Sequence, residues 1–168
     1  MRDNRIISSA LIVIDVQKGF ISDKTEYVLP IIKEYIYEFK GDCIIATQFV
    51  NEGGGFESIL HWNRLKDSPE IEVLDFVVEK SDYVVKKNLY SACSEEIIGI
   101  LEENNIQEVY LIGIDTDCCV LKTAIDLFEM NKRPVVVARC CASNGGKESH
   151  EAALKVLSRT IGEAQIEF

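Results

Sequence analysis

Short runs of apolar, mostly β-branched residues recur along this chain and alternate with amphipathic segments of helical spacing. The apolar runs cover residues 10–14, 43–50, 83–85, 109–112, 134–138 and 164–168. Because they are apolar almost throughout, these runs are typical of strands buried on both faces, as in a parallel sheet. Helical spacing of apolar residues occurs at 28–39, 95–101, 119–130 and 151–157. This alternation predicts right-handed βαβ units and a doubly wound α/β fold.

A single domain is expected to include the whole chain, residues 1–168. A length of 168 residues matches the usual size of one domain. The composition, with 47% hydrophobic and 27% charged residues, is that of a globular protein rather than a disordered or coiled-coil one. We find no internal repeat and no linker, and we interpret the three glycines at 53–55 as part of a loop after the second strand.

The net charge of −10 argues against two classes of partner. Nucleic acids and anionic membrane surfaces both attract basic segments, and this sequence has no run of Lys or Arg. The apolar run at 10–14 ends at Asp15, so it is too short for a signal-peptide core or a membrane span. These features predict a cytoplasmic protein whose partner is a small molecule, with no nucleic acid and no membrane.

Six cysteines are present, and we interpret all of them as thiols. They are Cys43, Cys93, Cys118, Cys119, Cys140 and Cys141. A chain of this size can build its own core, and neighbouring cysteines bridge each other only with strain. The two adjacent pairs also lack the spacing of zinc fingers. We therefore expect neither a disulfide framework nor a structural zinc ion.

Polar residues follow the apolar runs at the points where the predicted strands end. In an open α/β sheet, ligands bind beyond the carboxyl ends of the strands. The residues expected there are Asp15 and Gln17, the segment 47–51, Lys86 and Lys87, the segment 115–119 and the segment 140–144. An acid, a base and a thiol are therefore expected to meet at one edge of the sheet.

Cys119 is the candidate nucleophile among these residues. It falls in the first turn of a predicted helix, where unpaired backbone N–H groups and the helix dipole favour a thiolate. Residues 115–117 are suited to cap that helix. The same N–H groups could hold the oxyanion of a tetrahedral intermediate. The alternative is a buried cysteine that only packs in the core.

Asp15 and Lys87 are the candidate partners of this thiol. A carboxylate at the end of a strand can accept the thiol proton and later return it to a leaving group. A cation beside both groups can stabilise their negative charges. The alternatives are a helix or loop cap for Asp15 and a solvated surface position for Lys87.

Read together, these segments resemble the isochorismatase-like cysteine hydrolase family. The resemblance is carried by residues 11–20 (LIVIDVQKGF), 87–91 (KNLYS), 113–120 (GIDTDCCV) and 134–154. Their order and spacing match across nearly the whole chain. The resemblance selects Cys119 over Cys118 as the nucleophile, because Cys119 directly precedes Val120.

The resemblance implies a specific fold and a catalytic arrangement. The implied fold is a three-layer α/β/α sandwich with a six-stranded parallel sheet. A cis peptide bond is implied between Ile114 and Asp115, with the backbone N–H groups of Asp115 and Cys119 forming an oxyanion hole. Cys119, Asp15 and Lys87 would form the catalytic triad, and self-association as a homodimer or homotetramer would follow.

One segment departs from the pattern of the nicotinamidases in this family. Those enzymes bind a metal ion through a Thr-Gln-Asp-x-His segment and a further His, whereas Phe49 and Asn51 stand at the Asp and first His positions here. His61 remains nearby, but one His is a poor site for a divalent ion. We therefore expect no metal and no cofactor, and a place in the metal-free branch that resembles N-carbamoylsarcosine amidase. The cysteine favours hydrolysis of a C–N bond in a small amide or ureido substrate.

The candidate substrate-binding residues surround the predicted nucleophile. They are Gln17, Asn51, Trp62, Arg64 and Tyr90, with residues 51–65 as part of a lid and 143–146 as a source of backbone donors. Arg64 could bind a carboxylate through two hydrogen bonds, or form a surface ion pair with a neighbouring acid. Trp62 could line the pocket or pack in the core. His61 and His150 are expected to have structural roles.

A non-catalytic protein on the same fold is the alternative function. It would bind a ligand or sense oxidation through Cys118 and Cys119, because a redox sensor also needs an acidic, exposed thiolate. Asp15 and Lys87 favour the enzyme, since a sensor has no use for a proton acceptor on another strand. The sequence leaves open the substrate and the roles of Cys118, Cys140 and Cys141.

Overall fold

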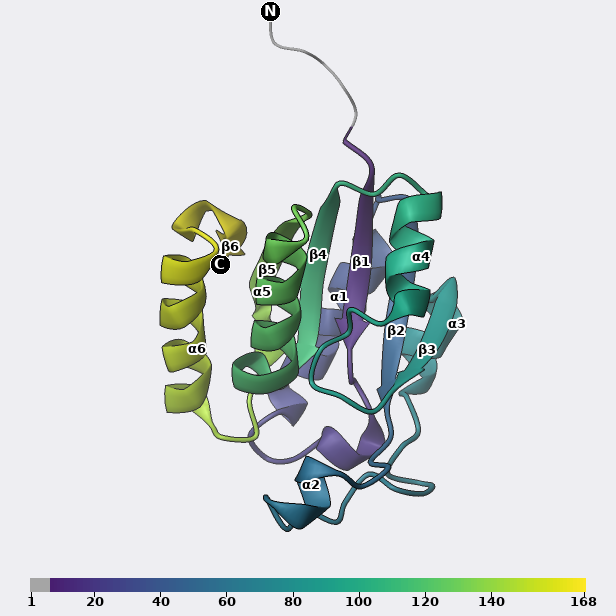
Figure 1. The fold of residues 1–168 in the computed structure, drawn as a ribbon, viewed down its shortest axis with the longest axis vertical. Coiled ribbons are helices and arrows are strands. Elements are labelled where there is room, and N and C mark those ends of the chain that lie inside the picture. The colour runs from purple at the N-terminus through teal and green to yellow at the C-terminus, as the bar shows by residue number, and fades with distance from the viewer. Residues whose placement is uncertain (1–6) are drawn as a thin grey trace, which may run out of the picture.

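The computed structural model describes residues 7–168, and residues 1–6 of the predicted domain lie outside the described residues. Six strands form one all-parallel sheet in the order β3-β2-β1-β4-β5-β6. The strands are β1 (Ser9–Ile14), β2 (Cys43–Phe49), β3 (Tyr83–Lys87), β4 (Glu108–Ile114), β5 (Arg133–Ala142) and β6 (Ile166–Glu167). Each overlaps one of the six predicted runs, so the predicted three-layer α/β/α fold is confirmed (Figure 1).

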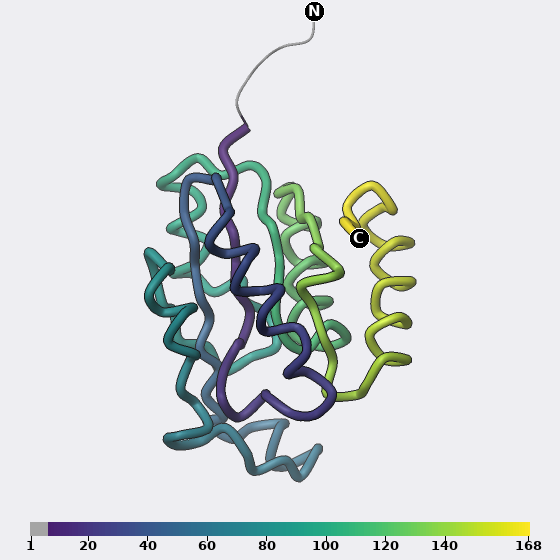
Figure 2. Tube along the Cα trace, turned by 180° about the vertical axis from the view of Figure 1, so that it is seen from behind, coloured from purple at the N-terminus to yellow at the C-terminus, as the bar shows by residue number. Residues whose placement is uncertain are grey.

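Helices cover both faces of the sheet. They are α1 (Leu29–Glu38), α2 (Gly55–Ser58), α3 (Asp75–Lys80), α4 (Glu95–Glu103), α5 (Leu121–Glu129) and α6 (Lys147–Thr160). Figure 1 shows α4, α5 and α6 in front of the sheet, and Figure 2 shows α1 crossing the opposite face. The short helix α2 lies in the loops below the carboxyl ends of the strands.

The sheet is buried on both sides, which explains why its strands have near-continuous apolar sequences. In β1, Ala10, Ile12 and Ile14 pack with α4, α5 and α6, while Leu11 and Val13 pack with α1 and α3. Successive side chains of a strand point to opposite faces, so a strand between two helical layers needs apolar residues at every position. This burial makes the central strands a rigid base for the loops at their ends.

Two helices and part of one strand differ from the sequence-based prediction. Helices α2 and α3 have four and six residues, which is too short to show a helical period. Strand β5 runs to Ala142 rather than ending near residue 138, after a register shift between Leu111 and Gly113 of β4. Cys140 and Cys141 therefore belong to a buried strand rather than to the loop that follows it.

No helix within residues 7–168 has the length and apolar character that crossing a bilayer requires.

Candidate active site

The backbone brings β1 and β4 into close contact where the candidate site begins. Gly113 pairs with Ile14 and has φ of 126°, and a Cβ there would lie 2.1 Å from the Ile14 carbonyl oxygen. Only glycine fits such an approach. The next residue of β1, Asp15, has φ of 51°, a left-handed conformation that Asp tolerates better than most residues. The close pairing thus places Asp15 directly beside the loop after β4.

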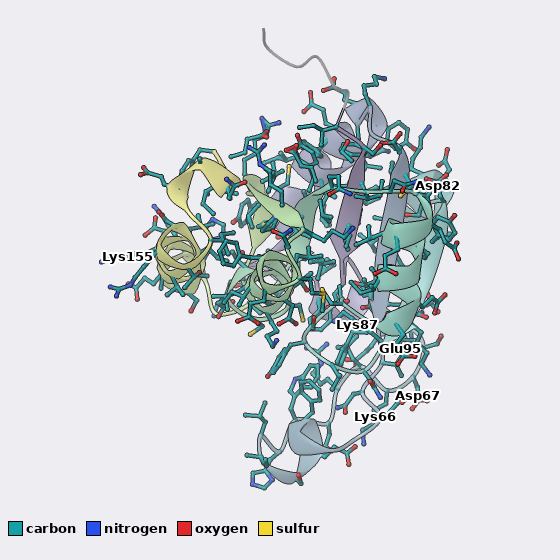
Figure 3. The ribbon with its side chains drawn as sticks, turned by 45° about the horizontal axis from the view of Figure 1, so that its top comes forward. Lys66, Asp67, Asp82, Lys87, Glu95 and Lys155 are labelled. Carbon is teal, nitrogen blue, oxygen red and sulfur yellow. The ribbon has the colours of Figure 1, made fainter. Side chains whose placement is uncertain are left out.

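Asp15, Lys87 and Cys119 meet below the carboxyl ends of β1, β3 and β4. The Lys87 ammonium lies 2.8 Å from Asp15 Oδ2 and 3.7 Å from Cys119 Sγ. Thr47 donates a 2.6 Å hydrogen bond to Asp15 Oδ1 and so fixes the carboxylate. All of these side chains are buried. Figure 3 labels Lys87 at the end of β3 that faces the loops around α2.

Lys87 is held by several groups at once. Its ammonium donates to the carbonyls of Leu89 at 2.8 Å and Tyr90 at 3.3 Å, and it lies 5.1 Å from the ring centroid of Phe49. Burial alone would lower the pKa of Lys87, but the Asp15 carboxylate and the hydrogen bonds to Asp15 and Cys119 outweigh it and the pKa is raised. Lys87 is therefore a fixed cation rather than a proton donor, and the predicted surface alternative is wrong.

The pKa of the Cys119 thiol differs from the prediction. Burial and the Asp15 carboxylate raise the pKa of Cys119 well above its usual value, and Lys87 lowers it only in part. The pKa of this thiol is thus shifted in the opposite direction from the expected acidification, because desolvation and the Asp15 carboxylate outweigh the Lys87 cation. Cys119 carries its proton and needs a base to become a nucleophile.

The turn that carries Cys119 is a π-helical segment, Thr116–Val120, that continues into α5. The peptide bond before it, Ile114–Asp115, is cis, where the family resemblance placed one. The expected side-chain capping is wrong, because these side chains bond to the segment after β5 and to α6. Asp115 accepts from Asn144, Asp117 accepts from Ser143, and Thr116 bonds His150. Residues 143–146 thus support this turn from the side.

A cavity of about 360 Å³ opens above Cys119. Its lining residues are Gly19, Phe20, Phe49, Phe56, Leu60, Trp62, Arg64, Tyr90, Asp115, Cys118, Cys119 and Asn144. The cavity is large enough for a small molecule, and five of its twelve lining residues are aromatic. Asp15 and Lys87 lie beneath Cys119 and do not line it, so a ligand in the cavity would meet the sulfur first.

Two predicted substrate-binding residues have structural roles instead. The side chain of Gln17 is fully buried, donates to the carbonyls of Phe49 and Ile71, and accepts from the Phe49 N–H. Asn51 donates to the carbonyls of Trp62 and Arg64. Neither side chain lines the cavity. Gln17 links the end of β2 to the loop at Ile71, and Asn51 closes the loop on itself, because buried amides must satisfy their hydrogen bonds.

Trp62, Tyr90 and Arg64 do line the cavity. Trp62 stacks on Phe20 with ring centroids 6.1 Å apart, so it belongs to the pocket wall. Arg64 forms the ion pair that was one of its two predicted roles, with 2.7 and 2.9 Å contacts to Glu70, and it also donates to the Gly19 carbonyl. Its guanidinium is thus already paired with a carboxylate.

The residues at the nicotinamidase metal positions do not fit a divalent cation. Phe49 is buried and offers a ring, Asn51 uses its amide within the loop, and His61 is exposed. Within residues 7–168, no three His, Cys, Asp or Glu side chains are grouped in a way that could hold a metal ion. We therefore derive no catalytic step through a metal at this site.

Sequence reasoning missed several residues of the site. Thr47 holds Asp15, and Phe20 and Phe49 line the cavity beside Phe56 of the predicted lid. Thr47 falls in the predicted segment 47–51, yet a single Thr carries no signal of its own. The aromatic residues come from three separate segments, so only the folded chain brings them together.

A comparison with protein families identifies the family to which this fold and site belong. Residues 9–165 match the family described as the isochorismatase domain. The chain belongs to the isochorismatase family. This match includes strands β1 to β5 and all of the cavity-lining residues, so the family resemblance seen in the sequence is confirmed at this level.

Two curated relatives of this isochorismatase-family protein come from Dictyostelium discoideum and Bacillus subtilis. Isochorismatase family protein 2A of Dictyostelium discoideum is 26% identical over 160 residues, which are 91% of this chain and 75% of that protein. The uncharacterized isochorismatase family protein PncA of Bacillus subtilis (strain 168) is 34% identical over 85 residues. That match spans half of this chain and 46% of the Bacillus protein.

Solved structures of family members share the fold. A pyrazinamidase/nicotinamidase from Streptococcus mutans UA159 has a TM-score of 0.79 and 27% identity, covering 92% of this chain and 98% of that chain. An N-carbamoylsarcosine amidase from Thermoplasma acidophilum has a TM-score of 0.77 and 25% identity, covering 96% of this chain and 95% of that chain. The neighbours thus include amidases of two types, and the comparisons do not separate the two branches.

Proposed function

We propose that this protein hydrolyses a C–N bond in a small amide or ureido substrate, with Cys119 as nucleophile. The observation that carries the proposal is the buried contact of Lys87 with both Asp15, at 2.8 Å, and Cys119, at 3.7 Å, beneath a cavity of small-molecule size. A nucleophile, a proton acceptor and a fixed cation in mutual contact are the parts that covalent catalysis requires.

In the proposed reaction, Cys119 and Asp15 exchange one proton. Cys119 sulfur bonds to the carbonyl carbon while the thiol proton passes to the Asp15 carboxylate. The tetrahedral intermediate then breaks its C–N bond, and Asp15 returns the proton to the departing nitrogen. Water attacks the thioester and gives a proton to Asp15, and the leaving sulfur recovers that proton as the acid product departs. The raised pKa of Cys119 makes this base necessary.

Backbone donors at the nucleophile turn would stabilise the oxyanion. The proposed donors are the N–H groups of Asp115, directly before the π-helical segment, and of Cys119, within it. The Asp115 carbonyl accepts from Cys118 and Val120, each at 3.2 Å, which holds the turn in one conformation. Preorganised donors of this kind stabilise a developing negative charge without reorganisation during the reaction.

We also place the protein in the metal-free branch. Phe49, Asn51 and His61 together lack the carboxylate and paired imidazoles of a nicotinamidase metal site, and the Asn51 amide is already used within its loop. Addition of a chelator should therefore leave the rate unchanged. A rate that falls with a chelator and returns with Zn²⁺ or Fe²⁺ would contradict this placement.

Variants of the two adjacent cysteines test the proposal. Ammonia release would be followed with a panel of primary amides and N-carbamoyl compounds. We expect Cys119→Ala to lose about 10³-fold or more in kcat/KM, and Asp15→Asn about 10²- to 10⁴-fold. Cys118→Ala is the matched control and should keep activity of the same order. Full turnover by the Cys119→Ala variant would exclude the proposed nucleophile.

The redox-sensing alternative is less compatible with the observed burial. Such a sensor needs a low-pKa, exposed thiolate. Burial raises the pKa of Cys118 to about 11 and raises that of Cys119 as well. Both thiols are therefore expected to be protonated near neutral pH, which favours the hydrolase.

A further inference from the structure

The carboxyl group of Asp115 lies in the wall of the cavity beside Cys119. One of its oxygens, Oδ1, accepts two hydrogen bonds from Asn144, at 2.8 Å from the backbone N–H and 2.9 Å from the side-chain amide. Among residues 7–168, the other oxygen, Oδ2, accepts no hydrogen bond. Asn144 thus fixes the orientation of the carboxyl group and leaves one acceptor for a ligand.

The cations near this carboxyl group are already paired with other acids. Among residues 7–168, Arg64 is the one Lys or Arg in the cavity wall, and it holds Glu70 at 2.7 Å. Lys87 beneath the cavity holds Asp15 at 2.8 Å. Glu70 and Asp15 therefore offset the charges of these two cations. The cavity keeps an acidic side chain whose charge no side chain of the described chain offsets by a direct contact.

The aromatic wall of the cavity also favours a cation. Phe20, Phe49, Phe56, Trp62 and Tyr90 form one connected cluster, with ring centroids 5.0 Å apart for the pair Phe56 and Tyr90 and 6.1 Å for Phe20 and Trp62. The faces of aromatic rings attract positive charge, and a cage of such rings is a known way to bind an ammonium group. The wall and the carboxyl group thus select for the same sign of charge.

Catalysis at this site would also benefit from a positively charged substrate. The proposed oxyanion hole uses the backbone N–H of Asp115, so a carboxylate on the same residue opposes the negative charge that develops there. A cationic group on the substrate would offset that carboxylate. This argument rests on the proposed hydrolase function.

We propose that the substrate is a small amide or ureide that also carries a protonated nitrogen, an ammonium or guanidinium group, and that Asp115 Oδ2 accepts a hydrogen bond from it. Asp115 is then a specificity-determining residue that sets the charge of the substrate. Cys119 acts on the C–N bond while Asp115 and the aromatic wall bind the cationic end.

Binding to a protein that cannot turn over its ligand tests this directly. In the Cys119→Ala background, calorimetry would compare meta-(aminomethyl)benzamide with its neutral isostere meta-ethylbenzamide and with the anion isophthalamate. We expect the cation to bind about tenfold more tightly than the neutral amide or better, the usual effect of one hydrogen bond to a charged group. Asp115→Asn should remove this preference, because it keeps the shape and loses the charge.

A surface variant controls for the overall charge of the protein. Asp67→Asn removes one negative charge from an exposed loop residue and should leave the preference unchanged. Equal binding of cation and neutral amide, tighter binding of the anion, a preference that persists in Asp115→Asn, or binding of none of the three would overturn the inference.

The pH dependence gives a second readout. Burial raises the pKa of Asp115 to about 6, the charges of Asp117 and Asp15 add to the rise, and the two bonds from Asn144 reduce it. The carboxyl group is thus ionised above that pH and neutral below it. The preference for the cation should therefore fall as the pH drops through about 6, and a preference that does not change would contradict a role for Asp115.

Turnover distinguishes this inference from the proposed function. If the cation binds preferentially but the protein with Cys119 intact releases ammonia from no amide or ureide, the hydrolase proposal fails and the charge preference stands. If ammonia is released faster from neutral or anionic amides than from cationic ones, the hydrolase stands and the charge preference fails.

Discussion

At the scale of single residues, the site depends on charges that are buried together. Asp15 and Lys87 compensate each other, and Thr47 fixes the carboxylate by a 2.6 Å hydrogen bond. A buried charge is stable only when it is paired and hydrogen-bonded. The same burial raises the pKa of Cys119, so the site stores a protonated thiol next to its base. Reactivity therefore requires the base as well as the thiol.

The raised pKa of Cys119 predicts slow alkylation in the free protein. At neutral pH, iodoacetamide should label Cys119 more slowly than it labels the same residue in urea, and the rate should rise only in alkaline solution. The reason is that the thiolate is the reactive form and burial disfavours it. Peptide mass analysis would locate the label. Labelling of Cys119 that is faster in the folded protein than in urea would contradict the direction of this shift.

At the scale of elements, loops and strand ends decide where these residues lie. The close approach of β4 to β1 requires Gly113, and the loop 51–74 requires the amides of Gln17 and Asn51. Gly113, Gln17 and Asn51 do not line the cavity, so none of them would touch the substrate. The elements nevertheless control the reaction, because they place Asp15 beneath Cys119 and Trp62 above it.

Substitution of Gly113 should be far more damaging than that of a helical glycine. A Cβ at Gly113 would lie 2.1 Å from the Ile14 carbonyl oxygen, and its φ of 126° is unsuited to alanine. We expect Gly113→Ala to lower the unfolding free energy by more than about 2 kcal/mol. In the matched control Gly99→Ala, within α4 and with open space around it, stability should rise by about 0.5–1 kcal/mol. Urea unfolding would measure both, and equal stabilities would refute the steric argument.

Loss of the Asn51 amide should loosen the wall of the cavity. Asn51→Ala removes the donors to the carbonyls of Trp62 and Arg64, which we expect to cost about 1–3 kcal/mol locally. Hydrogen exchange in residues 53–65 should become faster, and KM should rise more than kcat falls. Asn63→Ala is the control, because Asn63 is exposed and its amide makes a single 3.5 Å contact in the loop. Unchanged exchange in the Asn51 variant would remove its proposed role.

At the scale of the whole molecule, the surface carries apolar side chains that a second copy could cover. Exposed examples are Phe128, Met130, Val156 and Phe168, the last with 79% of its surface accessible. Exposed side chains of this size are available for burial at an interface. The family resemblance also implies self-association, so we expect a dimer or tetramer.

Light scattering at several protein concentrations tests this expectation. We expect a mass of two or four times 18.9 kDa, and a substitution such as Phe168→Ser should shift the distribution toward the monomer if that residue lies in the interface. A single species of 18.9 kDa at every concentration would exclude self-association.

The sequence by itself determined the fold class, the six strands and the order of the candidate catalytic residues, because apolar periodicity and strand-end chemistry are local properties. It also indicated Cys119, Asp15 and Lys87, since the topology of a parallel sheet brings strand ends to one edge. Its assignments for Gln17 and Asn51 failed because a buried amide and an exposed one look the same in one dimension.

Only the tertiary structure decided the charges and the shape of the cavity. The proton on Cys119, the ion pair of Arg64 and the open oxygen of Asp115 all depend on which groups lie within a few ångströms and how much water reaches them. Desolvation and pairing depend on which groups are neighbours in three dimensions. Such neighbours can be far apart in the sequence, as Phe20 and Asn144 are, with a separation of 124 residues. The sequence thus fixes which chemical groups are available, and their packing sets their protonation and their partners.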